Sequence, residues 1–115
     1  MSITIYHNPR CSKSRQTLQL LSEKGLDPQI IDYLNTPPSS EELKLTLGLL
    51  GMQARELMRK NESVYAECGL DDETLSEDQL IDAMVANPVL IERPIVLANG
   101  KARIGRPPGN VLEIL

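Results

Sequence analysis

The sequence has few aromatic residues and no excess of positive charge. Among its 115 residues there is no phenylalanine or tryptophan, and only three tyrosines are present. Aromatic platforms on which single-stranded nucleic acid could stack are therefore scarce. The formal net charge at pH 7 is −4, so there is no general basic surplus to displace the counterions of a phosphate backbone. These two absences argue against a protein that binds nucleic acid.

Long hydrophobic runs and a cysteine framework are also missing. No segment approaches the roughly 18 apolar residues of a membrane-spanning helix, and the N-terminus lacks the basic and apolar regions of a signal peptide. Two cysteines, Cys11 and Cys68, are too few for a secreted disulfide scaffold. Together with the single histidine they match no zinc-site spacing. We therefore expect a cytoplasmic protein with no membrane association, no metal and no bound cofactor.

The first third of the chain reads as a β-α-β unit. Alternating residues predict a strand over residues 3–6, and a helix follows from about residue 11 to Lys24, with Gly25 as its stop signal. A second strand is predicted over residues 29–33. Two strands joined through a helix are expected to be parallel, with a right-handed crossover.

The middle of the chain is predicted to be helical. Capping boxes formed by Ser39 with Glu42 and by Ser76 with Gln79 each precede an apolar periodic segment. A shorter helix is predicted over about residues 54–60. We interpret residues 36–90 as a helical insertion within one domain that spans residues 1–115.

The clearest local signal is a β-hairpin near the C-terminus. Asn99-Gly100, the preferred pair for a two-residue type I′ turn, lies between the predicted strands Ile95–Ala98 and Lys101–Ile104. A short closing helix is predicted over residues 110–115. The complete order predicts an α/β fold with a mixed four-stranded sheet and a helical insertion between the second and third strands.

Cys11 is the candidate nucleophile because it lies where the first strand gives way to the first helix. A helix N-terminus carries partial positive charge and free N–H groups, which favour a thiolate. Arg10, Lys13 and Arg15 add three cations without an anion, and Ser14 follows three residues later. Such surroundings lower a cysteine pKa, whereas an inert cysteine usually lies among apolar residues. We therefore interpret Cys11 as reactive.

Cys11 has no second thiol close to it in the sequence. The motif is Cys-x-x-Ser, with Ser14 where a two-thiol redox motif has its second cysteine. Turnover should therefore require an outside thiol such as glutathione. Cys68 lies in a polar stretch and is interpreted as incidental. His7 is either a general base or electrostatic partner for Cys11, or only the last residue of its strand.

Two arginines are predicted to meet at the open end of the hairpin. In a hairpin with a two-residue turn, the residue numbers of every paired couple add up to the same value. Arg93 and Arg106 give the same sum as the expected pair Ala98 and Lys101. Like charges placed opposite each other are destabilising unless an anion joins them. The arginines therefore suggest an oxyanion site, and two separately solvated side chains are the alternative. A phosphatase-type loop is excluded because position 17 is threonine, not arginine.

Several motifs along the chain resemble one family. They are Ile-Tyr-His-Asn-Pro-Arg-Cys-Ser-Lys-Ser-Arg at residues 5–15, Asn35-Thr36-Pro37-Pro38, Leu57-Met58-Arg59-Lys60-Asn61, Asp78-Gln79-Leu80-Ile81, Ile91-Glu92-Arg93-Pro94-Ile95-Val96 and Gly105-Arg106-Pro107. This set resembles the glutaredoxin-coupled arsenate reductase (ArsC) family over nearly the whole chain. The resemblance implies a thioredoxin-like (glutaredoxin-like) fold with a helical insertion.

The resemblance also implies a reaction. Cys11 would attack the arsenic of arsenate while Arg59, Arg93 and Arg106 hold the oxyanion. Glutathione would then attack the arseno-cysteine adduct, and glutaredoxin would reduce the mixed disulfide so that arsenite leaves.

The family pattern implies roles for three further residues. His7 and Ser14 match positions that help to keep the cysteine ionised. Pro94 matches the cis-proline beside the active site of thioredoxin folds.

Two other functions compete with arsenate reduction. One is a glutathione-dependent thiol reductase of unknown substrate. The other is an Spx-type regulator that binds RNA polymerase, but such regulators typically have Cys-x-x-Cys where this chain has Cys11 and Ser14. The chain also ends soon after its last motif, whereas arsenic-resistance members of the family continue with a further tail.

Overall fold

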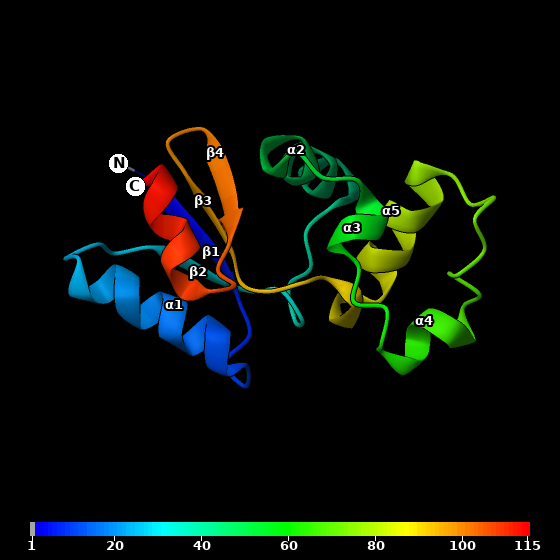
Figure 1. The fold of residues 1–115 in the computed structure, drawn as a ribbon, viewed down its shortest axis with the longest axis horizontal. Coiled ribbons are helices and arrows are strands. Elements are labelled where there is room, and N and C mark those ends of the chain that lie inside the picture. Colours follow the sequence, from blue (N-terminus) through cyan, green and yellow to red (C-terminus); the bar gives the residue numbers. More distant parts are fainter. Residues whose placement is uncertain (1) are drawn as a thin grey trace. The chain divides into compact units, whose positions relative to one another are not determined.

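The computed structural model describes residues 2–115 (Figure 1). The chain forms two compact units. One unit comprises Met1–Thr36 and Arg93–Leu115, and the other comprises Pro37–Glu92. The second unit lies close to the predicted insertion at residues 36–90.

The first unit contains a mixed four-stranded sheet in the order β2-β1-β3-β4. The strands are β1 (Ile3–His7), β2 (Gln29–Asp32), β3 (Ile95–Ala98) and β4 (Lys101–Ile104). β1 and β2 are parallel, whereas β3 is antiparallel to both β1 and β4. The predicted mixed sheet and the parallel β-α-β start are therefore confirmed.

Two helices pack on one face of this sheet. α1 (Ser12–Glu23) follows β1, and the chain ends with a 3-10 helix, η2 (Pro108–Ile114). Their apolar side chains share one buried cluster with the strands, made of Ile3, Ile5, Leu21, Val96, Ala98, Val111 and Ile114. Residues two apart in a strand point to the same side, so one face of β1 and β3 supplies the sheet part of this core.

The predicted short closing helix is present, but it starts before residue 110. The segment is a 3-10 helix that begins at Pro108, with Pro107 before it. Two consecutive prolines remove two backbone donors and leave a short segment, which favours the tighter i→i+3 bonding. Val111 and Ile114, three residues apart, still reach the core together.

The second unit is helical, as predicted. Its elements are α2 (Ser40–Leu50), α3 (Ala54–Leu57), α4 (Ser63–Glu67), α5 (Glu77–Ala86) and the 3-10 helix η1 (Pro88–Leu90). Both predicted capping boxes are present, with Ser39 capping α2 and Ser76 capping α5. Such caps satisfy helix N–H groups that would otherwise lack a partner.

The helix predicted over residues 54–60 stops at Leu57. Met58 adopts an extended conformation and forms an isolated antiparallel bridge with Ile91. Arg59 N–H then donates to the Leu90 carbonyl at 2.7 Å, and Glu92 N–H donates to the Leu57 carbonyl at 3.1 Å. This short pairing of distant segments replaces the helix, and nothing in the local pattern indicated it.

The hairpin between β3 and β4 has the predicted turn and register. Asn99 and Gly100 both have positive φ, at 55° and 71°, as a type I′ turn requires. Ala98 pairs with Lys101 and Ile95 with Ile104. Pairing continues one step further, because Gly105 N–H donates to the Pro94 carbonyl at 2.9 Å.

Gly105 lies against α1 and Pro94 with no room for a side chain. A Cβ at this position would clash with Thr17 Oγ1 and would lie 2.9 Å from Pro94 Cγ. Thr17 cannot easily move, because it is buried and its hydroxyl donates to the Lys13 carbonyl at 2.8 Å. The absent side chain of Gly105 thus lets the end of the hairpin approach α1 closely.

We expect Gly105→Ala to lower the free energy of unfolding by about 1–3 kcal/mol, the usual cost of overpacking. Urea unfolding followed by circular dichroism measures this change. Gly109→Ala is the matched control, since nothing lies within 4 Å of a Cβ there. Equal urea midpoints for the two variants would contradict the close contact of Gly105 with Thr17 and Pro94.

Candidate active site

Cys11 caps the N-terminus of α1, directly after a tight turn that leaves β1. Cys11 N–H donates to the Asn8 carbonyl at 3.0 Å, and Arg10 N–H donates to Asn8 Oδ1 at 3.0 Å. The backbone of Cys11 is extended, and only 7% of the residue is exposed. Asn8 therefore shapes the turn through its carbonyl and its side chain. The sequence offered only the Asn-Pro break as a signal for this role.

The surroundings of Cys11 lower its thiol pKa. Burial is the largest single influence and raises the pKa, but several donors together outweigh it. These donors are the N–H of Ser14, the guanidinium of Arg93 and the N–H of Lys13. Ser14 and Lys13 provide the free N–H groups of the first helical turn, which favour negative charge at this place. The thiolate is thus stabilised by the helix start and by one arginine.

Two arginines from the open end of the hairpin gather at the sulfur. Arg106 Nη2 donates to Cys11 Sγ at 3.4 Å, and Arg106 Nε donates to the Arg93 carbonyl at 2.7 Å. Arg93 acts on the thiolate both through its charge and through a side-chain hydrogen bond. The register argument therefore placed the two arginines correctly, and their proximity to Cys11 comes from the fold.

Both arginines precede cis prolines. The Arg93–Pro94 peptide bond is cis, as the family resemblance implied, and Arg106–Pro107 is cis as well. The second cis bond was not indicated by any sequence pattern. Pro94 is buried and its carbonyl accepts the last hydrogen bond of the hairpin, from Gly105.

His7 contacts Ser14. His7 Nδ1 lies 2.6 Å from Ser14 Oγ, and this hydroxyl accepts from Asn8 N–H at 3.0 Å. Burial is the main reason why the pKa of His7 is lowered; Arg15 lowers it further and Asp32 opposes both. A neutral imidazole can accept at Nδ1, which leaves the Ser14 hydroxyl proton to donate to it. His7 and Ser14 thus form a buried pair beneath the turn that presents Cys11.

The lowered thiol pKa should be visible in the alkylation rate of Cys11. In a Cys68→Ser background, we expect the rate to rise with pH around a midpoint below that of the same chain unfolded in urea. A folded pKa below the unfolded one stabilises the fold above the unfolded pKa, and this contribution is lost as the pH falls through the folded pKa. Equal midpoints in the folded and unfolded chains would contradict thiolate activation.

Arg59 belongs to the second unit, where two carboxylates surround its guanidinium. Arg59 Nη1 pairs with Glu62, and Arg59 Nε lies 3.8 Å from Glu92 Oε1. Its backbone is fixed by the hydrogen bond to the Leu90 carbonyl. The side chain is therefore held in place, and its oxyanion-binding role remains a prediction from its motif.

Cys68 is exposed at the end of α4, and both cysteines are free thiols. Within residues 2–115, no group of three or more His, Cys, Asp or Glu side chains could hold a metal ion. No helix in this range is long and apolar enough to cross a bilayer.

Comparisons with known proteins identify the family. A model of the ArsC family matches residues 6–114. The uncharacterised protein YfgD of Escherichia coli K12 is 60% identical over 98% of this chain and 96% of its own length. An arsenate reductase of Neisseria meningitidis serogroup A is 50% identical over 98% and 97%. The solved structure of an arsenate reductase from Vibrio cholerae has a TM-score of 0.97 at 57% identity, over 100% of this chain and 98% of that one. The chain belongs to the ArsC family.

Proposed function

We propose that this protein reduces arsenate to arsenite with Cys11 as its nucleophile. The observation that carries the proposal is the position of Sγ, at a helix N-terminus and beside Arg93 and Arg106. Arsenate is a tetrahedral oxyanion, and guanidinium forks bind such groups well. Relatives at 50% identity that bear the name arsenate reductase support the same assignment.

The first step is attack of the Cys11 thiolate on arsenic. A sulfur–arsenic bond forms, and one arsenate oxygen leaves as water after it is protonated. Arg93 and Arg106 bind the remaining oxygens and stabilise the negative charge in the transition state. The lowered pKa of Cys11 raises the fraction of thiolate that is ready to attack.

Turnover then requires two electrons to convert As(V) to As(III). We assign them to two outside thiols, since Ser14 stands where a second cysteine would be needed. Glutathione attacks the arsenic of the arseno-cysteine adduct and displaces a second water. A glutaredoxin thiol then attacks the glutathione sulfur, which forms the mixed disulfide and leaves As(III) bound to Cys11. One water hydrolyses the Cys11–arsenic bond, so that arsenite leaves and the thiol is restored. Per cycle, arsenate and two thiols give arsenite, one disulfide and one water, so atoms and electrons balance. Glutathione is thus a co-substrate and not a bound cofactor.

Three further residues complete the proposed site. Arg59 is assigned to oxyanion binding on the strength of its motif. His7 and Ser14 are assigned as positioning residues, because the Ser14 hydroxyl joins the imidazole to the Asn8 N–H while the Ser14 N–H acts on Sγ. They hold the turn in the shape that ionises Cys11, without touching the substrate.

The assay of arsenite formation tests this proposal. Purified protein is supplied with arsenate, glutathione, glutaredoxin and a glutathione-regenerating system, and each component is omitted in turn. We expect arsenite formation to require the protein, arsenate, glutathione and glutaredoxin, whereas omission of the regenerating system only limits the total amount of arsenite. Absence of arsenite with any thiol system rejects arsenate reduction. Equal rates without glutaredoxin, or with thioredoxin in its place, reject the proposed route of turnover while keeping the substrate.

A further inference from the structure

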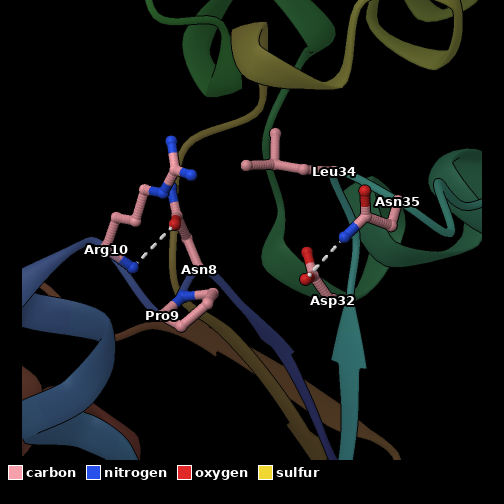
Figure 2. A pocket seen from close by; sticks show the side chains of 6 residues that line it. All are labelled: Asn8, Pro9, Arg10, Asp32, Leu34 and Asn35. Carbon is pink, nitrogen blue, oxygen red and sulfur yellow. Dashed lines mark hydrogen bonds between the residues drawn. The ribbon is translucent and has the colours of Figure 1, made fainter.

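A cavity of about 280 Å³ lies beside the turn that leads to Cys11. Its walls are Asn8, Pro9 and Arg10 after β1, and Asp32, Leu34 and Asn35 at the end of β2 (Figure 2). β1 and β2 are parallel, and His7 with Asp32 is the last pair of their ladder. The cavity therefore lies at the carboxyl ends of two parallel strands, a common place for ligands in α/β folds.

The cavity contains one cation and one anion that do not pair. Among residues 2–115, the ion pairs include neither Arg10 nor Asp32. Asp32 Oδ2 accepts from the Asn35 amide at 2.9 Å, while Asp32 Oδ1 is buried without a hydrogen-bond partner. Asp32 as a whole is only half-buried, so its carboxylate remains accessible from the cavity. A carboxylate without an ion-pair partner can bind a positive group of a ligand.

The neighbouring histidine does not compensate the carboxylate. His7 is the titratable group beside Asp32 from the adjacent strand, and burial lowers its pKa. A neutral imidazole leaves the negative charge of Asp32 available. Arg10 is exposed, and Figure 2 shows it on the opposite wall from Asp32 and Asn35.

We propose that this cavity binds the zwitterionic γ-glutamyl end of the thiol co-substrate, glutathione. Its α-carboxylate would pair with Arg10 and its α-ammonium with Asp32, while Leu34 contacts the two methylene groups that lead from the α-carbon to the γ-amide. Two opposite charges on one ligand match the two charges of the cavity. This inference rests on the proposed function only for the identity of the thiol.

The size and position of the cavity fit this occupant. At about 280 Å³ it is slightly smaller than typical sites for whole drug-sized ligands, so it suits one end of a tripeptide. Arg10 directly precedes Cys11, and consecutive Cα atoms are about 3.8 Å apart. The proposal requires that a ligand anchored by its first residue places its second residue, the cysteine, at Cys11, which directly follows the cavity wall in the chain.

Binding can be measured without turnover. The Cys11→Ser protein is titrated with S-methylglutathione, which cannot form a disulfide, and followed by two-dimensional NMR. We expect shifts concentrated at Asn8, Arg10 and Asn35. The analogue with a glutaryl group in place of γ-glutamate, which lacks the ammonium, should bind roughly ten-fold more weakly or worse. Free glutamate should also bind more weakly, and equal affinity would identify an amino-acid site instead.

Two variants test the charges of the cavity. Arg10→Gln and Asp32→Asn, each made in the Cys11→Ser protein, should weaken S-methylglutathione binding by about ten-fold or more. The matched controls Lys24→Gln and Asp27→Asn remove the same charges at exposed positions outside the cavity and should bind normally. Arg10→Gln changes an exposed side chain, so it keeps the test valid if Asp32→Asn unfolds.

The outcomes separate this inference from arsenate reduction. Absence of binding at millimolar concentration, shifts confined to other residues, or normal binding by Arg10→Gln would overturn the cavity assignment. When it is made in the protein that keeps Cys11, Arg10→Gln should raise the KM for glutathione without changing the KM for arsenate. If wild-type protein forms no arsenite but the titration succeeds, the proposed function fails and the cavity assignment stands.

Discussion

Replacement of Cys11 by serine is expected to abolish arsenite formation, with a loss of more than roughly 10³-fold in kcat/KM. A serine hydroxyl is almost fully protonated at neutral pH, so the helix start and the arginines cannot ionise it as they ionise the thiol. The serine side chain is nearly the same size as the buried cysteine, so the fold should be retained. Arsenite production, together with urea unfolding of the variant, measures both points.

Cys68→Ser is the matched control for this experiment. Cys68 is exposed, and it lies in the second unit at the end of α4. We expect this variant to keep wild-type activity in the presence of glutathione and glutaredoxin. A comparable loss from Cys68→Ser would show that Cys68 resolves the intermediate, and the outside thiol would then reduce a Cys11–Cys68 disulfide instead of attacking the adduct.

Neutralising the arginines of the hairpin is expected to have the second largest effect. Arg93→Gln and Arg106→Gln should each lower kcat/KM for arsenate by roughly 10²–10³-fold, as removal of one oxyanion donor does in other enzymes. The two variants should differ in how much they change the pKa of the Cys11 thiol. Arg93 lowers the pKa of Cys11 through charge and hydrogen bonding, so Arg93→Gln should raise the pH midpoint of Cys11 alkylation. Arg106→Gln should raise it less.

Arg103→Gln is the control for a general effect of charge on this hairpin. Arg103 lies on β4, where its guanidinium donates to the Ala102 carbonyl and to Glu113. Arg103→Gln should leave unchanged both the rate of arsenite formation and the pH midpoint of Cys11 alkylation. Equal losses in all three variants would mean that the hairpin acts through its overall charge, and a selective oxyanion site would be rejected.

The hairpin shows how much a local pattern can predict. Asn99 and Gly100 fix the turn, the turn fixes the register, and the register brings Arg93 and Arg106 together. All of this follows from neighbouring residues and the constant geometry of paired strands. The same local reasoning found the capping boxes of α2 and α5, because the groups that satisfy a helix start lie within four residues.

The incorrect or missing predictions concern segments whose conformation depends on distant partners. α3 stops at Leu57 because Met58 and Arg59 pair with the chain near Ile91. α4 was not predicted, and none of its five residues is buried, so it carries no apolar periodicity to detect. Periodic patterns reveal packing faces, and an element without such a face leaves little trace in the sequence.

The sequence by itself determined the strand and helix order of the first unit, the hairpin register and the candidate nucleophile, because each depends on residues close together in the chain. The tertiary structure decided what surrounds Cys11. The open end of the hairpin packs against α1 where Gly105 fits against Thr17, near the middle of the helix, and Arg106 reaches the sulfur at the helix start. Pairing of β1 with β2 likewise placed the Asp32 carboxylate beside the turn of Arg10. Such contacts join residues far apart in sequence, so only packing of the whole unit fixes them.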